Sequence, residues 1–343
     1  MAKFSPQVSI ILPVYNGDKF LASAIESCLA QKYEDFELII VNDCSSDNSL
    51  AIAQSFANRD SRIKIINNST NLKLPKSLNK GHNIAEGKFL TWTSHDNLLN
   101  ENYLKLLIKN IVESKADLIF SNFDIIWEDG TYKRTNIAGP IQSLIFGDVV
   151  GASFLYRKEV FTSLKGYQDN LYLVEDYDFF LRASTKFKFF HLDQVLYKYR
   201  IQSKSLTASI SSKMHFANLH QHALKNMYEN VGSIFNFNKN TVEFLVQQYF
   251  KKDFSMQFYL KHRKTIKKDI SNYFCHLKIN SSHQNINFLY IKIFWKWYET
   301  KKDHTISILV ESILKEPKII FNSKNNRNAV IQMFLDCFLS LKL

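Results

Sequence analysis

Short apolar runs rich in β-branched residues alternate along the first part of the chain with segments whose apolar residues recur at helical spacing. The strand-like runs are residues 8–14, 36–41, 63–66, 88–93 and 117–120. The segments between them have helical periodicity, as Leu21, Ala24, Ile25 and Cys28 illustrate. Strands and helices that alternate this regularly favour a mostly parallel central sheet with flanking helices. The sequence therefore predicts an α/β fold.

The residue composition and the hydrophobic pattern of the chain change after about Ser205. Before that point the strand and helix patterns continue: we expect a loosely patterned stretch at 124–148, strands at 151–156, 187–191 and 196–199, and a helix from Glu175 to about Thr185. Beyond it glycine nearly vanishes, and aromatic and lysine-rich helical patterns take over. We therefore predict an α/β domain over residues 1–207 and a mainly α-helical region over 208–343.

The charge balance points to an anionic neighbour. Lys+Arg 44 against Asp+Glu 32 gives a net charge of +12 over 343 residues. Such a balance suits a nucleic acid, an anionic membrane surface or a diphosphate-bearing substrate, and the alternative is simply a solvated basic surface. No basic groove motif for nucleic acid is present, so we expect no nucleic-acid partner.

The cysteines and the apolar runs favour a cytoplasmic protein. The four cysteines are scattered without a CxxC pair, which indicates neither a zinc site nor a disulfide framework. Residues 1–7 are too short and polar for a signal peptide, and no run of 18 apolar residues appears. The expected location is the cytoplasm, with the inner face of the cell membrane as an option.

Acidic residues follow the ends of predicted strands. Asp96 comes just after the strand at 88–93, and Asn42-Asp43 closes the second strand. Glu175-Asp176 forms a third acidic cluster at the start of a predicted helix. Open α/β sheets bind ligands at the carboxyl ends of their strands, so these acids are candidate site residues.

Five segments together resemble the family 2 glycosyltransferases. The segments are Val8–Asn16, Val41–Asp47, Asn79–Gly81, Gly87–Asn97 and Glu175–Arg182, in the order and spacing of that family. The resemblance covers roughly residues 5–207. It implies the GT-A nucleotide-sugar fold and an inverting transfer from a UDP-sugar donor to a glycan or lipid-linked acceptor, in cell-surface polysaccharide biosynthesis.

The resemblance also implies which residues bind the nucleotide. It implies that Pro13, Tyr15 and Asn16 lie at the exit of the first strand, where the Tyr15 ring can stack on uracil. It implies that Asp43 accepts a hydrogen bond from the uracil imide N–H, which an ionised acid does well. A helix-capping or turn acid is the alternative for Asp43. Further nucleotide contacts are implied for the residues Asn79, His95, Asp96 and Arg200.

The metal motif departs from the family pattern. Asp96 matches the metal-binding acid, but Ser94 or His95 stands where a second acid is usual, and Gln202 stands where many members have histidine. One carboxylate with phosphates and waters is a normal arrangement for Mg²⁺. We therefore expect a divalent metal, Mg²⁺ or Mn²⁺, on Asp96 with a weakened requirement. His95 is read as a ribose or phosphate donor ahead of a metal ligand.

Asp176 matches the catalytic base of the family. An inverting transfer needs one carboxylate to take the proton of the acceptor hydroxyl, and the helix dipole favours the ionised form of Asp176. Glu175 is expected to orient the base or the acceptor. Asp178 and Arg182, four residues apart, are read as a structural ion pair. The alternative for Asp176 is a stabilising acid at a helix start.

Two questions stay open in the sequence. Residues 286–299 carry a wide apolar surface with a narrow stripe at Lys292, Lys296 and Glu299. This pattern suits a helix lying in a membrane surface, or a helix packed in a helical subdomain or oligomer interface; residues 329–343 are a second candidate. For the whole chain, the alternative to an enzyme is a nucleotide-sugar-binding pseudoenzyme or assembly partner with a weakened metal site.

Overall fold

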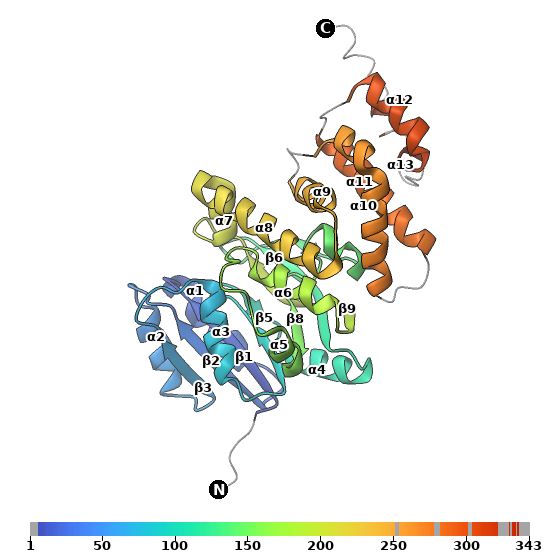
Figure 1. Ribbon diagram of the computed structural model, residues 1–343. Helices are drawn as coiled ribbons and strands as arrows, with labels where there is room; N and C mark the ends of the chain where they lie inside the picture. Colours follow the sequence, from blue (N-terminus) through green and yellow to red (C-terminus); the bar gives the residue numbers. More distant parts are fainter. Residues whose placement is uncertain are drawn as a thin grey trace. The chain divides into compact units, whose positions relative to one another are not determined.

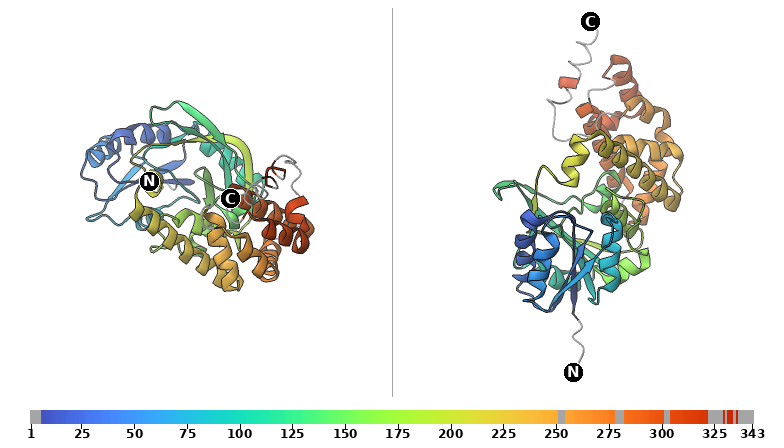
Figure 2. Two further views of the ribbon diagram at one scale, coloured as in Figure 1. Left: turned by 90° about the horizontal axis from the view of Figure 1, so that it is seen from above. Right: turned by 90° about the vertical axis from the view of Figure 1, so that its left-hand side faces the viewer.

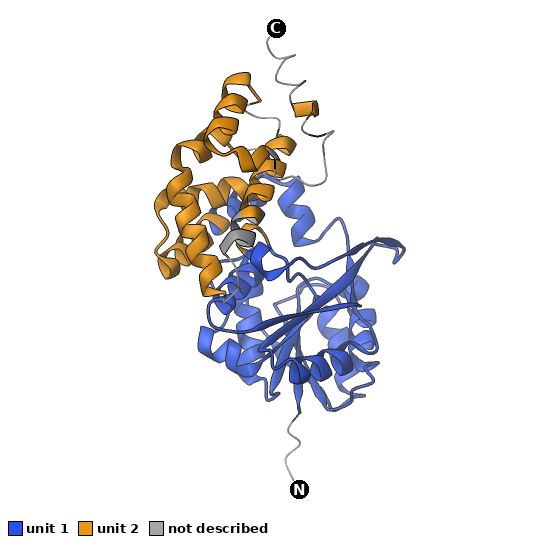
Figure 3. Cartoon of the chain, turned by 90° about the vertical axis from the view of Figure 1, so that its right-hand side faces the viewer, with its two compact units in different colours: residues 1–144, 148–223 blue, residues 145–147, 224–343 orange. Residues whose placement is uncertain are grey.

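A computed structural model describes residues 6–250, 254–277, 282–300, 304–321, 329, 331–333 and 335. These residues form two compact units, coloured separately in Figure 3. The first contains residues 1–144 and 148–223, and the second contains residues 145–147 and 224–343. The division falls inside one helix, α8 (Met214–Phe235).

The first unit is built on a nine-stranded sheet. Its strand order is β3-β2-β1-β4-β8-β6-β9-β5, with β7 paired to β6. The strands are β1 (Val8–Val14), β2 (Phe36–Asn42), β3 (Ile63–Asn67), β4 (Phe89–Trp92), β5 (Leu98–Leu99), β6 (Leu118–Ile126), β7 (Tyr132–Asn136), β8 (Phe154–Arg157) and β9 (Phe189–Arg200). Pairing is parallel among β3, β2, β1 and β4, whereas β8, β5 and β7 pair antiparallel with their neighbours. The expected α/β fold is confirmed, with a mixed sheet.

Helices cover both faces of the sheet (Figures 1 and 2). They are α1 (Asp18–Leu29), α2 (Ser49–Ala57), α3 (Leu74–Ile84), α4 (Tyr103–Glu113), α5 (Lys158–Leu164), α6 (Glu175–Ser184) and α7 (Leu206–Ser212), with a 3-10 turn at Ile141–Phe146. Alternate residues of β1 pack into one core with α1 and α4. On the other face α3 approaches closely, because a Cβ at Gly81 would lie 2.6 Å from Ile11 Cγ2.

Several elements differ from the sequence prediction. The two late strands are one long strand, β9. The hairpin strand β7 lies in the loosely patterned stretch, and β5 and α5 lie at residues for which we predict no element. The β9 pattern is broken by Asp193, whose carboxylate accepts a hydrogen bond from Asn122 Nδ2 at 2.7 Å. The pairing register of β6 and β9 shifts at that point. A bulge therefore accommodates the polar residues without ending the strand.

The second unit is helical. It contains most of α8 together with α9 (Lys239–Tyr249), α10 (Met256–His276), α11 (Ser282–Thr300), α12 (Ile306–Lys315) and α13 (Pro317–Phe321). Leu289, Ile293, Phe294 and Trp297 of α11 are fully buried. These apolar residues of the predicted amphipathic helix therefore pack inside the unit, as the packed-helix alternative expects. The candidate at 329–343 lies almost wholly outside the described residues.

Among the described residues, none of the helices combines the length and apolarity that a bilayer crossing requires.

Candidate active site

Three parallel strands end side by side at one edge of the sheet. After β2, the Asp43 backbone N–H donates to the Val14 carbonyl at 2.8 Å. After β4, the Thr93 N–H donates to the Ile11 carbonyl at 2.9 Å. The exits of β1, β2 and β4 therefore meet where open sheets bind their ligands, as the sequence predicts.

Asp43 organises the loop between β3 and α3. Its buried carboxylate accepts hydrogen bonds from Asn68 Nδ2 (2.9 Å) and the Leu72 N–H (2.8 Å) at Oδ1, and from the Lys73 N–H (2.9 Å) at Oδ2. These contacts are those of the turn acid that the sequence left as an alternative. An ionised carboxylate accepts about four hydrogen bonds, so the uracil contact of Asp43 stays a prediction.

The exit of β1 presents an aromatic ring. Pro13 is buried in the strand, whereas the Tyr15 side chain is 49% exposed, which leaves its ring open for stacking. Asn16 has a left-handed backbone, with a φ of 50°. Its Oδ1 accepts from the Ser46 N–H at 2.8 Å, and its own N–H donates to Ser45 Oγ at 3.0 Å. Asn16 therefore joins the β1 exit to the loop that follows Asp43.

Asp96 is held by residues at the end of β9. Its buried carboxylate accepts from Gln202 Nε2 at 2.6 Å. Its carbonyl accepts from Arg200 Nε at 2.9 Å, and the Arg200 N–H donates to Asn97 Oδ1 at 2.8 Å. Residues 96–97 are thus fixed to β9 from two sides.

The Arg200 side chain is used to hold residues 96–97 in position. Besides its bond to the Asp96 carbonyl, its Nη1 donates to the Glu128 carbonyl at 2.9 Å, and its guanidinium lies 4.6 Å from the centre of the Phe20 ring. The side chain is buried. The structure gives Arg200 a positioning task, and the phosphate contact implied by the resemblance stays a prediction.

His95 packs against the start of α1. A Cβ at Gly17 would lie 2.3 Å from His95 Cδ2, so only glycine allows the ring to sit there. Burial lowers the pKa of His95, and the nearby Asp96 and Asp47 carboxylates oppose this change only in part. The imidazole is therefore neutral near pH 7.

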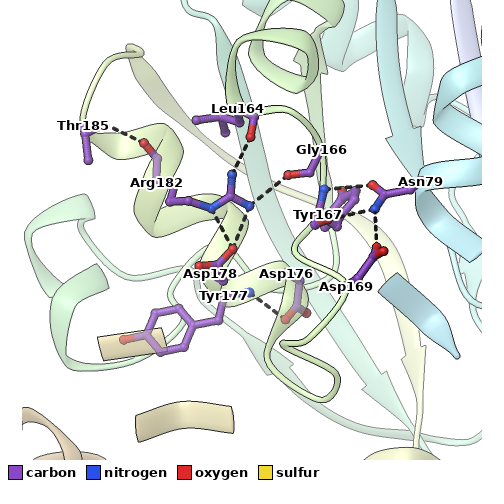
Figure 4. A network of polar contacts seen from close by, with 10 residues as sticks. All are labelled: Asn79, Leu164, Gly166, Tyr167, Asp169, Asp176, Tyr177, Asp178, Arg182 and Thr185. Atoms are coloured by element: carbon purple, nitrogen blue, oxygen red, sulfur yellow. Dashed lines mark hydrogen bonds and ion pairs between the residues drawn. The ribbon is translucent and has the colours of Figure 1, made fainter. Parts of the chain in front are cut away.

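The loop before α6 is strained where it delivers Asp176. Leu173 has a φ of 81°, a conformation that branched side chains rarely adopt. Its N–H donates to Glu175 Oε2 at 2.7 Å, and the Tyr177 N–H donates to Asp176 Oδ1 at 2.7 Å. Figure 4 shows Asp176 at the start of the helix, on the side of Asp169 and Asn79. Asp176 is half-buried, so it remains accessible to a substrate.

Asp178 and Arg182 fix the position of the same helix, α6, through a buried ion pair. Their side chains form a buried ion pair at 2.7 Å, which confirms the structural pair read from the sequence. Arg182 also donates to the carbonyls of Leu164 and Gly166, each at 3.0 Å (Figure 4). The guanidinium therefore joins α6 to the end of α5.

Three carboxyl groups influence one another at the start of α6. Burial and the charge of Asp176 raise the pKa of Glu175 to about 8. The surrounding protein and Asp176 also raise the pKa of Asp148, although part of Asp148 is open to solvent. Burial raises the pKa of Asp176 as well. The charge of Asp176 therefore opposes the ionisation of both neighbours.

Asp148 was missed in the sequence. It lies in the loosely patterned stretch between β7 and β8, where its Oδ1 accepts from the N–H groups of Val150 (2.9 Å) and Gly151 (3.2 Å). The available signal was an acid set between Gly147 and Gly151, which alone indicates only a turn.

The pKa values of two tyrosines are affected by acids from distant parts of the chain. Burial, then the charges of Glu175 and Asp43, raise the pKa of Tyr172 to about 12. Burial also raises the pKa of Tyr199, and the charges of Asp96 and Asp176 add to the increase. Each ring therefore lies within electrostatic range of two acids. Since Glu175 and Asp176 are consecutive in α6, these two rings relate Asp43 and Asp96 to the same helix start.

The sequence matches a family model and a set of curated relatives. Residues 9–173 match the family described as Glycosyl transferase family 2. The putative glycosyltransferase EpsE of Bacillus subtilis is 30% identical over 223 residues, which are 60% of this chain and 79% of that protein. This chain belongs to the family 2 glycosyltransferases.

Other relatives are matched over part of their length. An uncharacterized glycosyltransferase of Rickettsia prowazekii is 28% identical over 214 residues, which cover 59% of this chain and 64% of that protein. A Rickettsia felis relative is 29% identical, and the match covers only 36% of it. The chain thus spans less than two thirds of the length of these curated relatives.

Solved structures confirm the GT-A type of fold. Staphylococcus aureus TarS 1-349, crystallised with UDP-GlcNAc, has a TM-score of 0.58 at 16% identity, over 91% of this chain and 92% of that one. The mannosyltransferase PcManGT of Pyrobaculum calidifontis, in complex with GDP-Man and Mn²⁺, has a TM-score of 0.53 at 11% identity, over 98% and 88% of the two chains. At these identities the likeness concerns the fold alone.

The metal site expected of this glycosyltransferase rests on one carboxylate. Among the described residues, no group of three His, Cys, Asp or Glu side chains could hold a metal ion. One Asp96 oxygen already accepts from Gln202. Mg²⁺ is commonly bound through one or two carboxylates plus substrate phosphates, so Asp96 fits such an ion only together with a diphosphate.

Asn79 of this glycosyltransferase clamps the loop that leads to Asp176. Its Nδ2 donates to the Tyr167 carbonyl (2.8 Å) and to Asp169 Oδ1 (3.0 Å), and its Oδ1 accepts from the Tyr167 N–H (2.9 Å) (Figure 4). Both amide N–H donors are therefore used. The predicted nucleotide contact of Asn79 stays a prediction; it would have to replace one of these bonds if Asn79 donates, or use the second lone pair of its Oδ1 if Asn79 accepts.

Proposed function

We propose that the protein is an inverting glycosyltransferase that moves a sugar from a UDP-sugar to a glycan or lipid-linked acceptor in cell-surface polysaccharide biosynthesis. The observation that carries the proposal is the placement of Tyr172 near Asp43 and Glu175, and of Tyr199 near Asp96 and Asp176. The family membership and the fold supply the class of reaction. The UDP-GlcNAc bound to the TarS structure supports the choice of donor class.

In the proposed reaction Asp176 acts as the general base. It takes the proton of the acceptor hydroxyl while that oxygen forms a bond to the anomeric carbon. The bond from the anomeric carbon to the diphosphate oxygen breaks on the opposite face, and UDP leaves. Asp176 suits this role because it is half-buried at the start of α6, and its charge raises the pKa of Glu175 and of Asp148. Glu175, protonated near pH 7, orients the base.

The remaining residues bind and position the donor. Tyr15 stacks on the uracil, and Asp43 accepts a hydrogen bond from the imide N–H of the uracil. Asp96 would hold a divalent cation on the diphosphate, and when bound this ion neutralises charge on the departing UDP. Arg200 and Gln202 keep the Asp96 carboxylate in place.

A UDP-release assay tests this proposal. The purified protein is screened with a panel of UDP-sugars, with and without Mg²⁺ or Mn²⁺. Asp176→Asn should lower kcat by roughly 10²–10⁴-fold, the usual contribution of a general base, while UDP binding measured by calorimetry is unchanged. Glu159→Gln, an exposed acid on α5, is the matched control. Full activity in Asp176→Asn would remove the base assignment.

The second candidate is a nucleotide-sugar-binding protein without transfer activity. The observation that favours it is the Gln202 amide on Asp96, because an N–H donor takes the place of a metal ligand. This reading predicts UDP binding without UDP release from any UDP-sugar in the panel. The same assay therefore separates the two candidates.

We also propose a peripheral association with an anionic membrane surface, where a lipid-linked acceptor would be found. The net charge of +12 supports this association. The buried apolar face of α11 does not contribute to it.

A further inference from the structure

The first unit contains a pocket that the proposed reaction does not use. It lies between α3 and α5 with the loop that follows α5, and it has a volume of about 590 Å³. Ligand-binding pockets commonly have volumes of about 300–1,000 Å³. The pocket is therefore large enough for a saccharide unit.

The lining of this pocket contains three lysines and one acid, Asp169, whose Oδ1 accepts from Asn79 Nδ2. Lys76 and Lys80 come from α3, and Lys165 comes from the end of α5. Within the described part of the chain, these lysines form no ion pair with an acidic side chain. Lys80 Nζ donates one hydrogen bond, to Asn68 Oδ1 at 2.8 Å. The pocket thus offers ammonium groups that are not neutralised by acidic partners.

Neutral groups complete the lining. Asn83 and Thr162 supply an amide and a hydroxyl, and Phe161 supplies an aromatic surface. Sugars present hydroxyl groups around a ring with apolar C–H faces, so amides, hydroxyls and an aromatic ring suit them. Lysines add recognition of an oxyanion, since an ammonium pairs with carboxylate or phosphate.

We propose that this pocket binds a negatively charged sugar unit of the acceptor glycan. The proposal rests on the proposed function and names its acceptor class. The pocket shares Asn79 and Asp169 with the loop that leads to Asp176. A glycan unit in the pocket would therefore contact the loop that leads to Asp176. Figure 4 shows Asn79 and Asp169 on this loop's side of the network.

The test measures sugar binding to the protein saturated with UDP. UDP keeps phosphate-bearing probes out of the diphosphate site, and the initial titration with UDP tests the donor site separately. The probes are glucose 6-phosphate and glucuronate, with glucose as the neutral comparison. Binding is followed by NMR shifts. We expect both anionic sugars to bind the wild type and glucose to bind at least tenfold more weakly.

Two triple variants locate the binding. Lys76→Gln with Lys80→Gln and Lys165→Gln should weaken both anionic probes at least tenfold. Lys88→Gln with Lys105→Gln and Lys186→Gln removes the same charge from exposed positions elsewhere and should leave binding unchanged. Equal losses in the two variants would overturn the pocket, since they would reflect net charge alone.

Further outcomes separate this proposal from the proposed function. Inorganic phosphate that binds as tightly as glucose 6-phosphate would overturn the sugar assignment. No binding of either anionic sugar, with UDP binding intact, would overturn the pocket and leave the donor site standing. Absence of UDP binding would instead overturn the proposed function.

Discussion

The Asp96 carboxylate is positioned by an amide. Gln202 Nε2 donates to one carboxylate oxygen at 2.6 Å, and Arg200 fixes the Asp96 backbone. An amide N–H cannot ligate a cation, whereas an imidazole nitrogen can. With its N–H turned towards Asp96, Gln202 keeps its carbonyl oxygen away from that carboxylate, whereas a histidine at position 202 would offer a ring nitrogen as a second ligand.

Gln202→His should increase metal affinity. We expect the protein–UDP complex to bind Mn²⁺ at least about tenfold more tightly, the lower range of the effects of metal-site residues. Electron paramagnetic resonance of free Mn²⁺ measures this directly, without an activity assay. Gln202→Leu removes the amide without adding a ligand, and it should give no gain. Equal affinity in the His and Leu variants would contradict the prediction.

Glu175 should make stability depend on pH. Burial and the charge of Asp176 raise its pKa from 4.5 to about 8. The folded state thus holds this proton more tightly than the unfolded chain, and the resulting stability is complete below about 4.5 and lost as pH rises towards 8. Glu175→Gln cannot ionise and can still accept from the Leu173 N–H.

Calorimetry at pH 5, 7 and 9 tests the Glu175 prediction. The Tm of the wild type should fall relative to that of Glu175→Gln as the pH increases. Glu159→Gln, which is exposed, should give a Tm curve parallel to the wild type. A parallel curve for Glu175→Gln would show that the Glu175 carboxyl ionises as easily in the folded state as in the unfolded chain.

At the scale of elements, the guanidinium of Arg182 holds α6 in position. Arg182 pairs with Asp178 and donates to two carbonyls at the end of α5. The four-residue spacing of Asp178 and Arg182 was visible in the sequence. The two carbonyls were not, because Leu164 and Gly166 lie 18 and 16 residues before Arg182 and are brought to it by the packing of α5 against α6.

Arg182→Ala should destabilise the first unit strongly. It leaves the fully buried Asp178 carboxylate unpaired, and breaking such a pair costs about 3–5 kcal/mol. Urea denaturation measures the loss. Arg182→Lys should not restore stability, since lysine lacks the planar fork that reaches three acceptors. Arg59→Ala, at an exposed position of the same unit, is the control. A loss of less than 1 kcal/mol in Arg182→Ala would contradict the assignment.

At the scale of the whole molecule, the basic charge and the packed helix α11 make different predictions about membranes. The net charge of +12 supports binding to anionic lipid. The apolar residues of α11 are buried in the second unit and do not reach a bilayer. We therefore expect the proposed association with an anionic membrane to be electrostatic, without insertion of α11 into the bilayer.

Vesicle sedimentation tests this docking. The protein should bind vesicles that contain about a third phosphatidylglycerol and should be released between 0.1 and 0.5 M NaCl, where screening shortens to a few ångström. Neutral phosphatidylcholine vesicles should not bind it. Binding that survives high salt would indicate apolar insertion and contradict the prediction.

The sequence by itself determined the parallel half of the sheet and the acids at its edge. Strands such as Val8–Val14 and Phe36–Asn42 are mostly apolar because both faces are buried, and this pattern is local. The buried polar pair within them, Ser9 and Glu37, is joined by a hydrogen bond of 2.6 Å. The acid after each strand is local as well. Its position in the chain is therefore enough to place it at the carboxyl edge.

Only the tertiary structure decided what surrounds each acid. The Gln202 bond to Asp96 spans 106 residues, and the Asn79 clamp on Tyr167 spans 88. Asp148 joins Asp176 from a stretch without periodicity. Hydrogen bonds and charge interactions between residues this far apart depend on how elements pack. No local spacing encodes them, and they decide which groups lie beside Asp96 and Asp176.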